Sequence, residues 1–341
     1  MTRVADPLDV LDADARAGLP RRGPEFVEPM LARLTGEHFS DPGWLYERKL
    51  DGVRIVAVRD SDGARLYSRN RKPLDGTYPE LVEALEQSAP EGLVADGEVV
   101  AFEGEQTSFA RLQGRLGITD PARARATGIE VKLYLFDAMA LGGHDLTGLP
   151  LRTRKQVLRA AVEFADPLRL CTHRNADGEA YLQQACEAGW EGLIAKRADA
   201  PYRPGRRSDD WLKFKCVREQ EFVIAGYTDP EGSRTDFGAL LVGYYDRDDH
   251  GHTALRYAGK VGTGFDQQVL ANLRARFDDL AAAASPFADR VRERGAHWVR
   301  PELVAQVAFT EWTRDSRLRH PRYLGLRDDK PATQVVREEA R

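Results

Sequence analysis

The segment from Trp44 to Arg54 constrains the fold more than any other part of the chain. Polar and apolar side chains alternate along its first half, which predicts a β-strand, and Asp51-Gly52 supplies a turn that ends or bulges this strand. Lys49 lies between the strand and the turn. We therefore expect the chain to build a sheet that presents the amine of Lys49 at the end of a strand.

Lysine is scarce in this chain, because 9 of the 50 basic residues are lysines and the other 41 are arginines. Arginine supplies the ordinary surface charge, so each lysine carries more information than usual. A lysine amine attacks phosphorus or carbonyl carbon only when it is deprotonated, and desolvation, nearby positive charge or a metal ion lowers its pKa. Arginine cannot replace it there. We interpret Lys49 as a nucleophile.

The string K-L-D-G-V-R from Lys49 to Arg54 resembles the K-x-D-G-x-R signature of the covalent nucleotidyltransferases. This family comprises ATP- and NAD-dependent polynucleotide ligases and mRNA capping enzymes. The alternative interpretation is a strand followed by a charged surface turn. Later segments favour the family, because they resemble its other motifs in the same order.

Three of these segments follow in the first half of the chain. A Ser-Arg pair at 68–69 ends a predicted hairpin, and the resemblance implies that Arg69 contacts the nucleotide phosphate or ribose. Residues 93–102 hold two apolar runs around Asp-Gly-Glu, and the resemblance places Glu98 near the ribose and metal. Phe136 matches the aromatic residue that stacks on the purine. The alternatives are a solvated arginine, a hairpin turn and a core phenylalanine.

The densest motifs lie between Glu191 and Lys215. E-G-L-I-A-K and W-L-K-F-K resemble the family elements E-G-[LIV]-[LIV]-x-K and W-x-K-x-K. Strand alternation places Lys213 and Lys215 on one face. Two lysines on one face repel each other unless an anion, such as a nucleotide phosphate, lies between them. The alternative is a solvated basic edge strand.

The resemblance implies a complete set of site residues, with Lys49 as the catalytic nucleophile. Residues expected to bind the nucleotide are Glu47, Arg54, Arg69, Glu98, Phe136, Lys196, Lys213, Lys215, Arg327 and Lys330. Residues expected to hold Mg²⁺, or alternatively Mn²⁺, are Asp51, Glu98 and Glu191. Carboxylate oxygens are hard ligands that suit magnesium.

The length of 341 residues suits two domains. Residues 1–24 show no periodicity and are expected to form a flexible leader. The resemblance implies an α+β adenylation domain of antiparallel sheets with flanking helices over 25–218. Residues 219–341 contain short strands separated by glycine turns, which predict a small β-barrel, an OB-fold by resemblance. The last part of this domain, 327–330, resembles the R-x-D-K element of DNA ligases.

Composition and cysteine usage indicate where in the cell the protein is expected to act. The chain has a net charge of −4, 42% hydrophobic residues and no apolar run near the length of a membrane helix. Its first residues lack the features of a signal peptide. The three cysteines are widely spaced without a Cys-x-x-Cys pair, so neither a disulfide framework nor a zinc site is expected. We expect a cytoplasmic, nucleoid-associated protein, with a local basic patch over 196–218 rather than a generally basic surface.

Stretches such as E-G-L-I-A-K-R and G-K-V-G-T-G-F resemble bacterial ATP-dependent DNA ligases of the end-joining type in particular. The resemblance implies sealing of nicked or broken duplex DNA through lysyl-AMP, by a ligase module expected to stand alone as a monomer. A Ku-type end-binding protein or a repair polymerase is an expected partner.

Three alternatives stay open at this point. An RNA ligase or a capping enzyme would use the same lysine. An NAD-dependent ligase is disfavoured, because its cysteine zinc module is absent from the sequence. A catalytically inactive nucleic-acid-binding protein is disfavoured, because the motif lysines and Glu98 are present.

Overall fold

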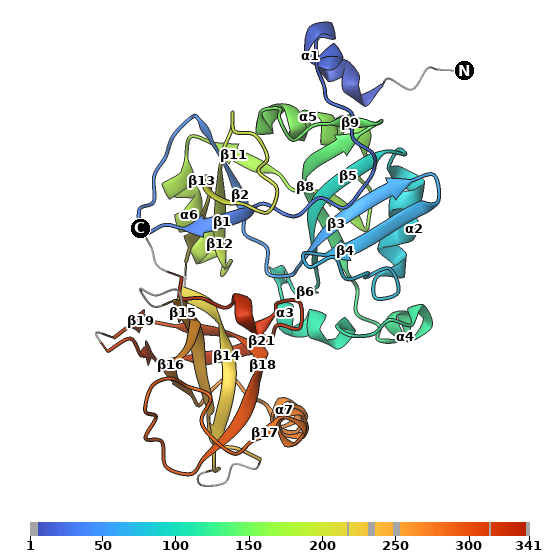
Figure 1. Cartoon of the computed structure of the whole chain (residues 1–341). Coiled ribbons are helices and arrows are strands. Elements are labelled where there is room, and N and C mark those ends of the chain that lie inside the picture. Colours follow the sequence, from blue (N-terminus) through green and yellow to red (C-terminus); the bar gives the residue numbers. More distant parts are fainter. Residues whose placement is uncertain (1–5, 217, 231–235, 248–252, 314, 339–341) are drawn as a thin grey trace. The chain divides into compact units, whose positions relative to one another are not determined.

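Two units divide the chain in the computed structural model, one ending at Cys216 and the other spanning residues 217–339 (Figure 1). The residues that the structure describes are 6–216, 218–230, 236–247, 253–313 and 315–338. No helix in these ranges is long and apolar enough to cross a membrane.

The first unit is a mixture of strands and helices, as the sequence predicts. Its strands are β1 (Leu31–Leu34), β2 (Trp44–Arg48), β3 (Val53–Asp60), β4 (Gly63–Ser68), β5 (Leu93–Val100), β6 (Phe102–Glu103), β7 (Gln106–Thr107), β8 (Lys132–Leu141), β9 (His144–Asp145), β10 (Leu168–Leu170), β11 (His173–Asn175), β12 (Gly192–Arg197) and β13 (Arg207–Lys215). Its helices are η1 (Pro7–Val10), α1 (Ala13–Ala17), α2 (Pro79–Ser88), α3 (Phe109–Leu112), η2 (Gln113–Arg115), α4 (Pro121–Ala126), α5 (Leu151–Ala161) and α6 (Gly178–Glu187).

Two mixed sheets organise these strands (Figure 1). Sheet A has the order β10-β8-β5-β3-β4, with β9 paired to β8, and sheet B has the order β1-β13-β12-β2-β11. Helix α5 packs on β8 and α2 on β4, both in sheet A, whereas α6 packs on β2, β11 and β12 of sheet B. Both sheets therefore have a helix-covered face.

Strand β8 is buried almost throughout because both of its faces meet apolar residues. Leu133, Leu135 and Ala138 join the core beneath the helices of sheet A. Phe136 and Met139 join a second cluster, which also contains Trp211 of sheet B. A strand covered on both faces has a nearly continuous apolar sequence, and this explains the pattern that predicts a buried strand here.

Alternation along sheet B separates its packing face from its polar face. Trp44 and Tyr46 of β2, with Leu193 and Ala195 of β12 and Phe214 of β13, pack in the cluster that includes α6. Side chains one position away point to the opposite face of the sheet. That second face consequently receives these residues of the predicted site: Glu47, Lys196, Lys213 and Lys215.

Glycine is required at two positions beside the predicted nucleophile. A Cβ at Gly52 would lie 2.1 Å from the carbonyl oxygen of Val99, so only glycine lets the start of β3 approach β5. Gly192 has a φ of +145°, and a Cβ there would lie 2.0 Å from the carbonyl oxygen of Phe214. Gly192 also accepts a hydrogen bond from the backbone N–H of Lys49, at 2.9 Å.

The second unit is built mainly of strands. Its elements are β14 (Arg218–Thr228), β15 (Leu240–Arg247), β16 (Thr253–Val261), α7 (Gln267–Asp279), β17 (Ala281–Ala282), β18 (Ala296–Phe309), β19 (Glu311–Trp312), β20 (Leu318–Arg319), β21 (Arg322–Leu326) and η3 (Ala332–Gln334). Antiparallel pairing gives a sheet of order β16-β15-β14-β18-β17, with β21 also paired to β18. Leu270, Leu273 and Phe277 of α7 pack into its core.

The N-terminal segment differs from the expected flexible leader. Residues 7–10 and 13–17 form η1 and α1, and the side chains of Asp6 and Asp12 cap them by accepting backbone hydrogen bonds. Leu8 is buried in the core beneath sheet A. The sequence gives no periodicity here because the apolar contacts of Leu8, Leu11 and Leu19 and two caps are too few and too unevenly spaced to produce a pattern.

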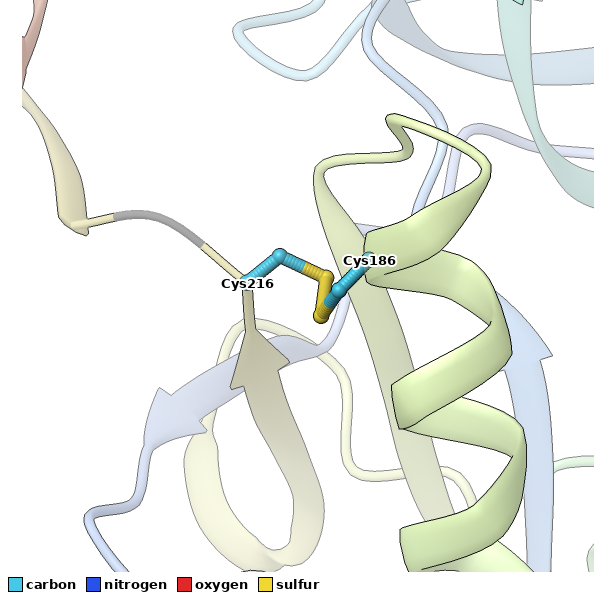
Figure 2. The surroundings of a disulfide bond; sticks show 2 residues. All are labelled: Cys186 and Cys216. Carbon is cyan, nitrogen blue, oxygen red and sulfur yellow. A yellow bond between two sulfur atoms is a disulfide. The ribbon is translucent and has the colours of Figure 1, made fainter.

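The expectation of no disulfide is wrong. Cys186, near the end of α6, and Cys216, directly after β13, form a disulfide with their Cα atoms 5.2 Å apart (Figure 2). Their separation of 30 positions in the chain makes the pairing invisible to spacing rules, since it depends on α6 packing against sheet B. Cys171 is free and buried.

Reduction of this disulfide is expected to destabilise the first unit. In the chain-entropy account, a cross-link that closes a loop of 30 residues contributes about 3–4 kcal/mol to the free energy of unfolding. Dithiothreitol should therefore lower the melting temperature of the wild type, and the Cys186→Ser/Cys216→Ser double variant should melt at this lower temperature with or without reductant. Equal melting temperatures for the oxidised wild type and the double variant would contradict the expectation.

Candidate active site

Lys49 lies at the end of β2, where the sequence predicts it, and its ammonium forms an ion pair with Oε2 of Glu191. Glu191 precedes β12, and the hydrogen bond from Lys49 N to the neighbouring Gly192 carbonyl brings the two side chains together. Nζ of Lys215 lies 3.8 Å from the other oxygen of the same carboxylate. Two predicted cations thus share one predicted metal ligand.

Glu191 is buried, and burial alone would raise the pKa of its carboxyl group. Lys49 and Lys215 outweigh this effect and lower the pKa, so the group is ionised at neutral pH. Its Oε1 atom is buried and accepts no hydrogen bond. This oxygen retains acceptor capacity for a ligand.

Glu47, also buried, lies between two further lysines. Its Oε1 accepts from Lys155 Nζ at 2.5 Å, and its Oε2 pairs with Lys196 Nζ at 2.6 Å. The Lys196 ammonium also lies 4.2 Å from the ring centroid of Phe136 and 4.1 Å from that of Trp211. The structure therefore brings Glu47, Lys196 and Phe136 together, as the sequence predicts, and adds Lys155.

Arg54 of β3 contacts the ring of Phe136 of β8, and both strands belong to sheet A. Its guanidinium donates to both oxygens of Asp96 at 2.5 and 2.6 Å and lies 4.7 Å from the centroid of the Phe136 ring. Tyr202 donates to Asp96 Oδ2 at 2.6 Å and accepts from the backbone N–H of Met30 at 2.8 Å. Asp96 is fully buried, so these donors offset the cost of its desolvation.

Three further predicted site residues of the first unit, Glu98, Asp51 and Arg69, lie in different surroundings. Glu98 lies opposite Arg54 across β5 and β3, and is half-buried. The backbone N–H of Asp51 donates to Thr107 Oγ1 at 3.3 Å. Nη2 of Arg69 is buried without a hydrogen-bond partner. Among the described residues, no three carboxylate, histidine or cysteine side chains gather as a metal site.

Arg327 and Lys330 belong to the second unit, where both form ion pairs. Arg327 donates to both oxygens of Asp329 at 2.9 and 3.0 Å, and Lys330 Nζ lies 2.9 Å from Glu221 Oε2. Both side chains are mostly buried. The structure therefore pairs both with carboxylates of their own unit: Arg327 with Asp329, which follows β21, and Lys330 with Glu221 on β14.

Sequence reasoning missed several residues around the site. Lys155 matches none of the motifs, although the scarcity of lysine is a signal that applies to it as well. Arg154 and Asp137 form a fully buried bidentate pair at 2.7 and 2.8 Å. Asp96 was noted only as part of a motif. No sequence signal identifies such partners, because they meet through the packing of α5 and the strands of sheet A.

Two family models match the chain. The model described as an ATP dependent DNA ligase domain matches residues 29–215, and the one described as an ATP dependent DNA ligase C terminal region matches residues 233–330.

Similar curated proteins are longer than this chain. The multifunctional non-homologous end joining protein LigD of Pseudomonas aeruginosa is 39% identical over 321 residues, covering 92% of this chain and 37% of that protein. A DNA ligase of Thermococcus fumicolans is 33% identical over 301 residues, covering 84% of this chain and 52% of that protein. The chain thus spans less than two thirds of the length of these relatives.

A solved structure described as a mycobacterial DNA ligase D complexed with ATP and MES is similar over 92% of this chain and all of that chain, with 32% identity and a TM-score of 0.66. Together with the family models, this similarity confirms the predicted fold class, an α+β nucleotidyltransferase domain followed by an OB-fold.

The pairing of Glu47 predicts a pH-dependent contribution to stability. Burial would raise the pKa of Glu47, but Lys155 and Lys196 outweigh burial and lower it. A lowered pKa in the folded state means that the contribution is present above the unfolded pKa of about 4.3 and is lost as the pH falls through the folded value.

Glu47→Gln should therefore reduce the free energy of unfolding by about 3–5 kcal/mol at pH 7, because it leaves two buried cations without their carboxylate. The difference from wild type should narrow as the pH falls toward 3. Urea unfolding at pH 7 and at pH 3 measures the difference in the free energy of unfolding. Glu103→Gln, which changes an exposed residue of β6, is the control. A difference that is constant with pH would show that Glu47 is not ionised in the folded protein.

Proposed function

Because the chain belongs to the family of ATP-dependent DNA ligases, we propose that it seals 5′-phosphate/3′-hydroxyl breaks in DNA in three steps. Lys49 Nζ attacks the α-phosphorus of ATP: a nitrogen–phosphorus bond forms, the bond to the β-phosphate oxygen breaks, and pyrophosphate and the proton of the amine leave. AMP then passes from Lys49 to the 5′-phosphate of the DNA. A 3′-hydroxyl displaces AMP and joins the strands.

The observation that supports this proposal best is the buried group of Lys49, Glu191 and Lys215. The amine of Lys49 is fixed at a strand end, and Lys215 places a second positive charge at the same carboxylate. The ion pair with Glu191 positions the amine of Lys49 before the phosphates arrive. An entering triphosphate then offers Lys49 and Lys215 new anionic partners. Such positioning is the main contribution a protein makes to phosphoryl transfer.

The nucleotide is proposed to extend from Phe136 toward Lys49. Phe136 stacks on the purine, and Glu47 and Lys196 lie at this base end, since Lys196 contacts the ring face. Arg54, Arg69 and Glu98 bind the ribose and phosphates, with Nη2 of Arg69 offering a donor that has no hydrogen-bond partner among the described residues. Lys213 and Lys215 bind the phosphates from sheet B.

Magnesium is proposed to bind together with ATP. This ion is usually held by one or two carboxylates plus phosphate oxygens and water, so a three-residue protein site is not required. Oε1 of Glu191, which lies 3.8 Å from Lys215 Nζ and accepts no hydrogen bond from a described residue, fits such a role, with Glu98 and Asp51 as the further proposed carboxylates. The ion would neutralise charge on the phosphates.

The proposed setting is DNA end joining in the bacterial cytoplasm, at the nucleoid. The Pseudomonas relative is named as an end-joining protein, and this supports nicked or broken duplex DNA as the substrate and a Ku-type protein or a repair polymerase as partner. Residues 25–218 would form the adenylation domain and 219–341 the OB-fold domain. An RNA ligase or capping activity would be recognised by a preference for RNA ends or for GTP.

Lys49→Ala and Lys49→Arg are both expected to abolish labelling of the protein by ATP, because neither side chain can form the lysyl phosphoramidate. Incubation with α-labelled ATP and magnesium, followed by denaturing electrophoresis, measures this. Lys72→Arg, which changes an exposed lysine after β4, is the control and should label like wild type. Labelling of Lys49→Arg would remove Lys49 from the mechanism.

Arg327 and Lys330 are proposed to orient the β- and γ-phosphates when the second unit closes, so only the first step needs them. Arg327→Ala and Lys330→Ala should impair lysyl-AMP formation by about 10-fold or more and largely preserve the sealing of nicked DNA that already carries 5′-AMP. Lys215→Ala should impair both reactions.

The comparison of ATP-driven labelling with ligation of pre-adenylated nicked DNA distinguishes these outcomes. Equal losses in both assays for the Arg327 and Lys330 variants would mean that these residues bind DNA or stabilise the second unit instead.

A further inference from the structure

Lys155 lies on α5, outside every segment that resembles a family motif, yet its ammonium contacts two residues of the proposed base end. Nζ donates to Glu47 Oε1 at 2.5 Å, to the carbonyl oxygen of Phe136 at 3.1 Å and to that of Cys171 at 3.2 Å. An ammonium has three protons, so all three are used. The side chain is 6% exposed, and it links the acidic residue and the backbone of the aromatic residue directly.

The carboxylate of Glu47 is fixed at both ends. Lys155 holds Oε1, and Lys196 holds Oε2 while lying over the ring of Phe136. A carboxylate accepts about four hydrogen bonds. Oε2 also accepts from the thiol of Cys171 at 3.8 Å, whereas Oε1 has Lys155 and keeps further acceptor capacity. Glu47 is therefore an ionised, oriented acceptor beside the ring that is proposed to stack on the purine.

We propose that Lys155 is a positioning residue for base selection: by tying Glu47 to the backbone of Phe136, it fixes an acceptor that favours a purine with a donor at position 6. ATP has an amino group there. ITP and GTP have a carbonyl oxygen, which would face the carboxylate as acceptor against acceptor and form no hydrogen bond with it. This inference rests on the proposed function, because it assumes that a purine triphosphate binds at Phe136.

A purely structural role for Lys155 makes a different prediction. If Lys155 only neutralises the buried carboxylate, its loss lowers stability and affects every nucleotide alike. If it positions Glu47 for the base, its loss changes the ratio of ATP to ITP use. ATP and ITP differ only at the position 6 substituent and in the proton that ITP carries on N1, so their ratio reports on this edge of the purine.

The test uses the full chain with Lys155→Met, which keeps an unbranched side chain of similar length and removes the charge. Lysyl-nucleotide formation is measured with α-labelled ATP, ITP and GTP, to give kcat and KM for each. In Lys155→Met we expect the ratio of kcat/KM for ATP over ITP to fall about 10-fold, mostly through a higher KM for ATP. Arg159→Met, an exposed position on the same helix, should keep the wild-type ratio.

Lys155→Arg provides the conservative variant, because it retains a cation that can hold Glu47. It should recover part of the ATP over ITP ratio, and it keeps the inference testable if Lys155→Met does not fold. An unchanged ratio in folded Lys155→Met, or a wild type that uses ATP and ITP equally, would overturn the inference and leave the ligase assignment intact. A wild type that labels with none of the triphosphates would instead overturn the proposed function.

Discussion

Four buried carboxylates of the first unit are each held by at least one cation, and the site depends on this pairing. They are Glu47, Asp96, Asp137 and Glu191. An ionised carboxylate in a nearly dry environment costs several kcal/mol unless it is paired and hydrogen-bonded. The pairs are therefore mutually dependent: no member can be removed without leaving a buried charge, and each fixes the side chain of its partner.

This pairing keeps the lysines of the proposed triphosphate site in place before any phosphate binds. Lys49 and Lys215 would repel each other across sheet B without the carboxylate of Glu191 between them. In the proposed function, a phosphate chain takes over from Glu191 as the counter-ion of these lysines. The position of Gly192 contributes, because its lack of a side chain lets β12 and β13 pair closely opposite Lys215.

Local patterns were enough to predict the elements that carry the motifs. The strand before Lys49, the hairpin of β3 and β4 and the buried β8 all follow from alternation, turn residues or apolar runs. The common face of Lys213 and Lys215 also follows, since Phe214 between them packs toward α6. What local patterns could not supply were contacts between segments distant in the chain, namely the Arg154–Asp137 pair, Lys155 on Glu47 and the Cys186–Cys216 disulfide.

The choice between arginine and lysine at these buried positions follows the geometry of the acceptors. Arg54 and Arg154 each meet one aspartate with two parallel hydrogen bonds, which the flat guanidinium fork suits. Lys155 instead serves a carboxylate and two backbone carbonyls from three directions, and a compact ammonium does this better than a planar group. In a chain with 41 arginines, Lys155 is thus a buried position where one ammonium donates to three acceptors on different residues.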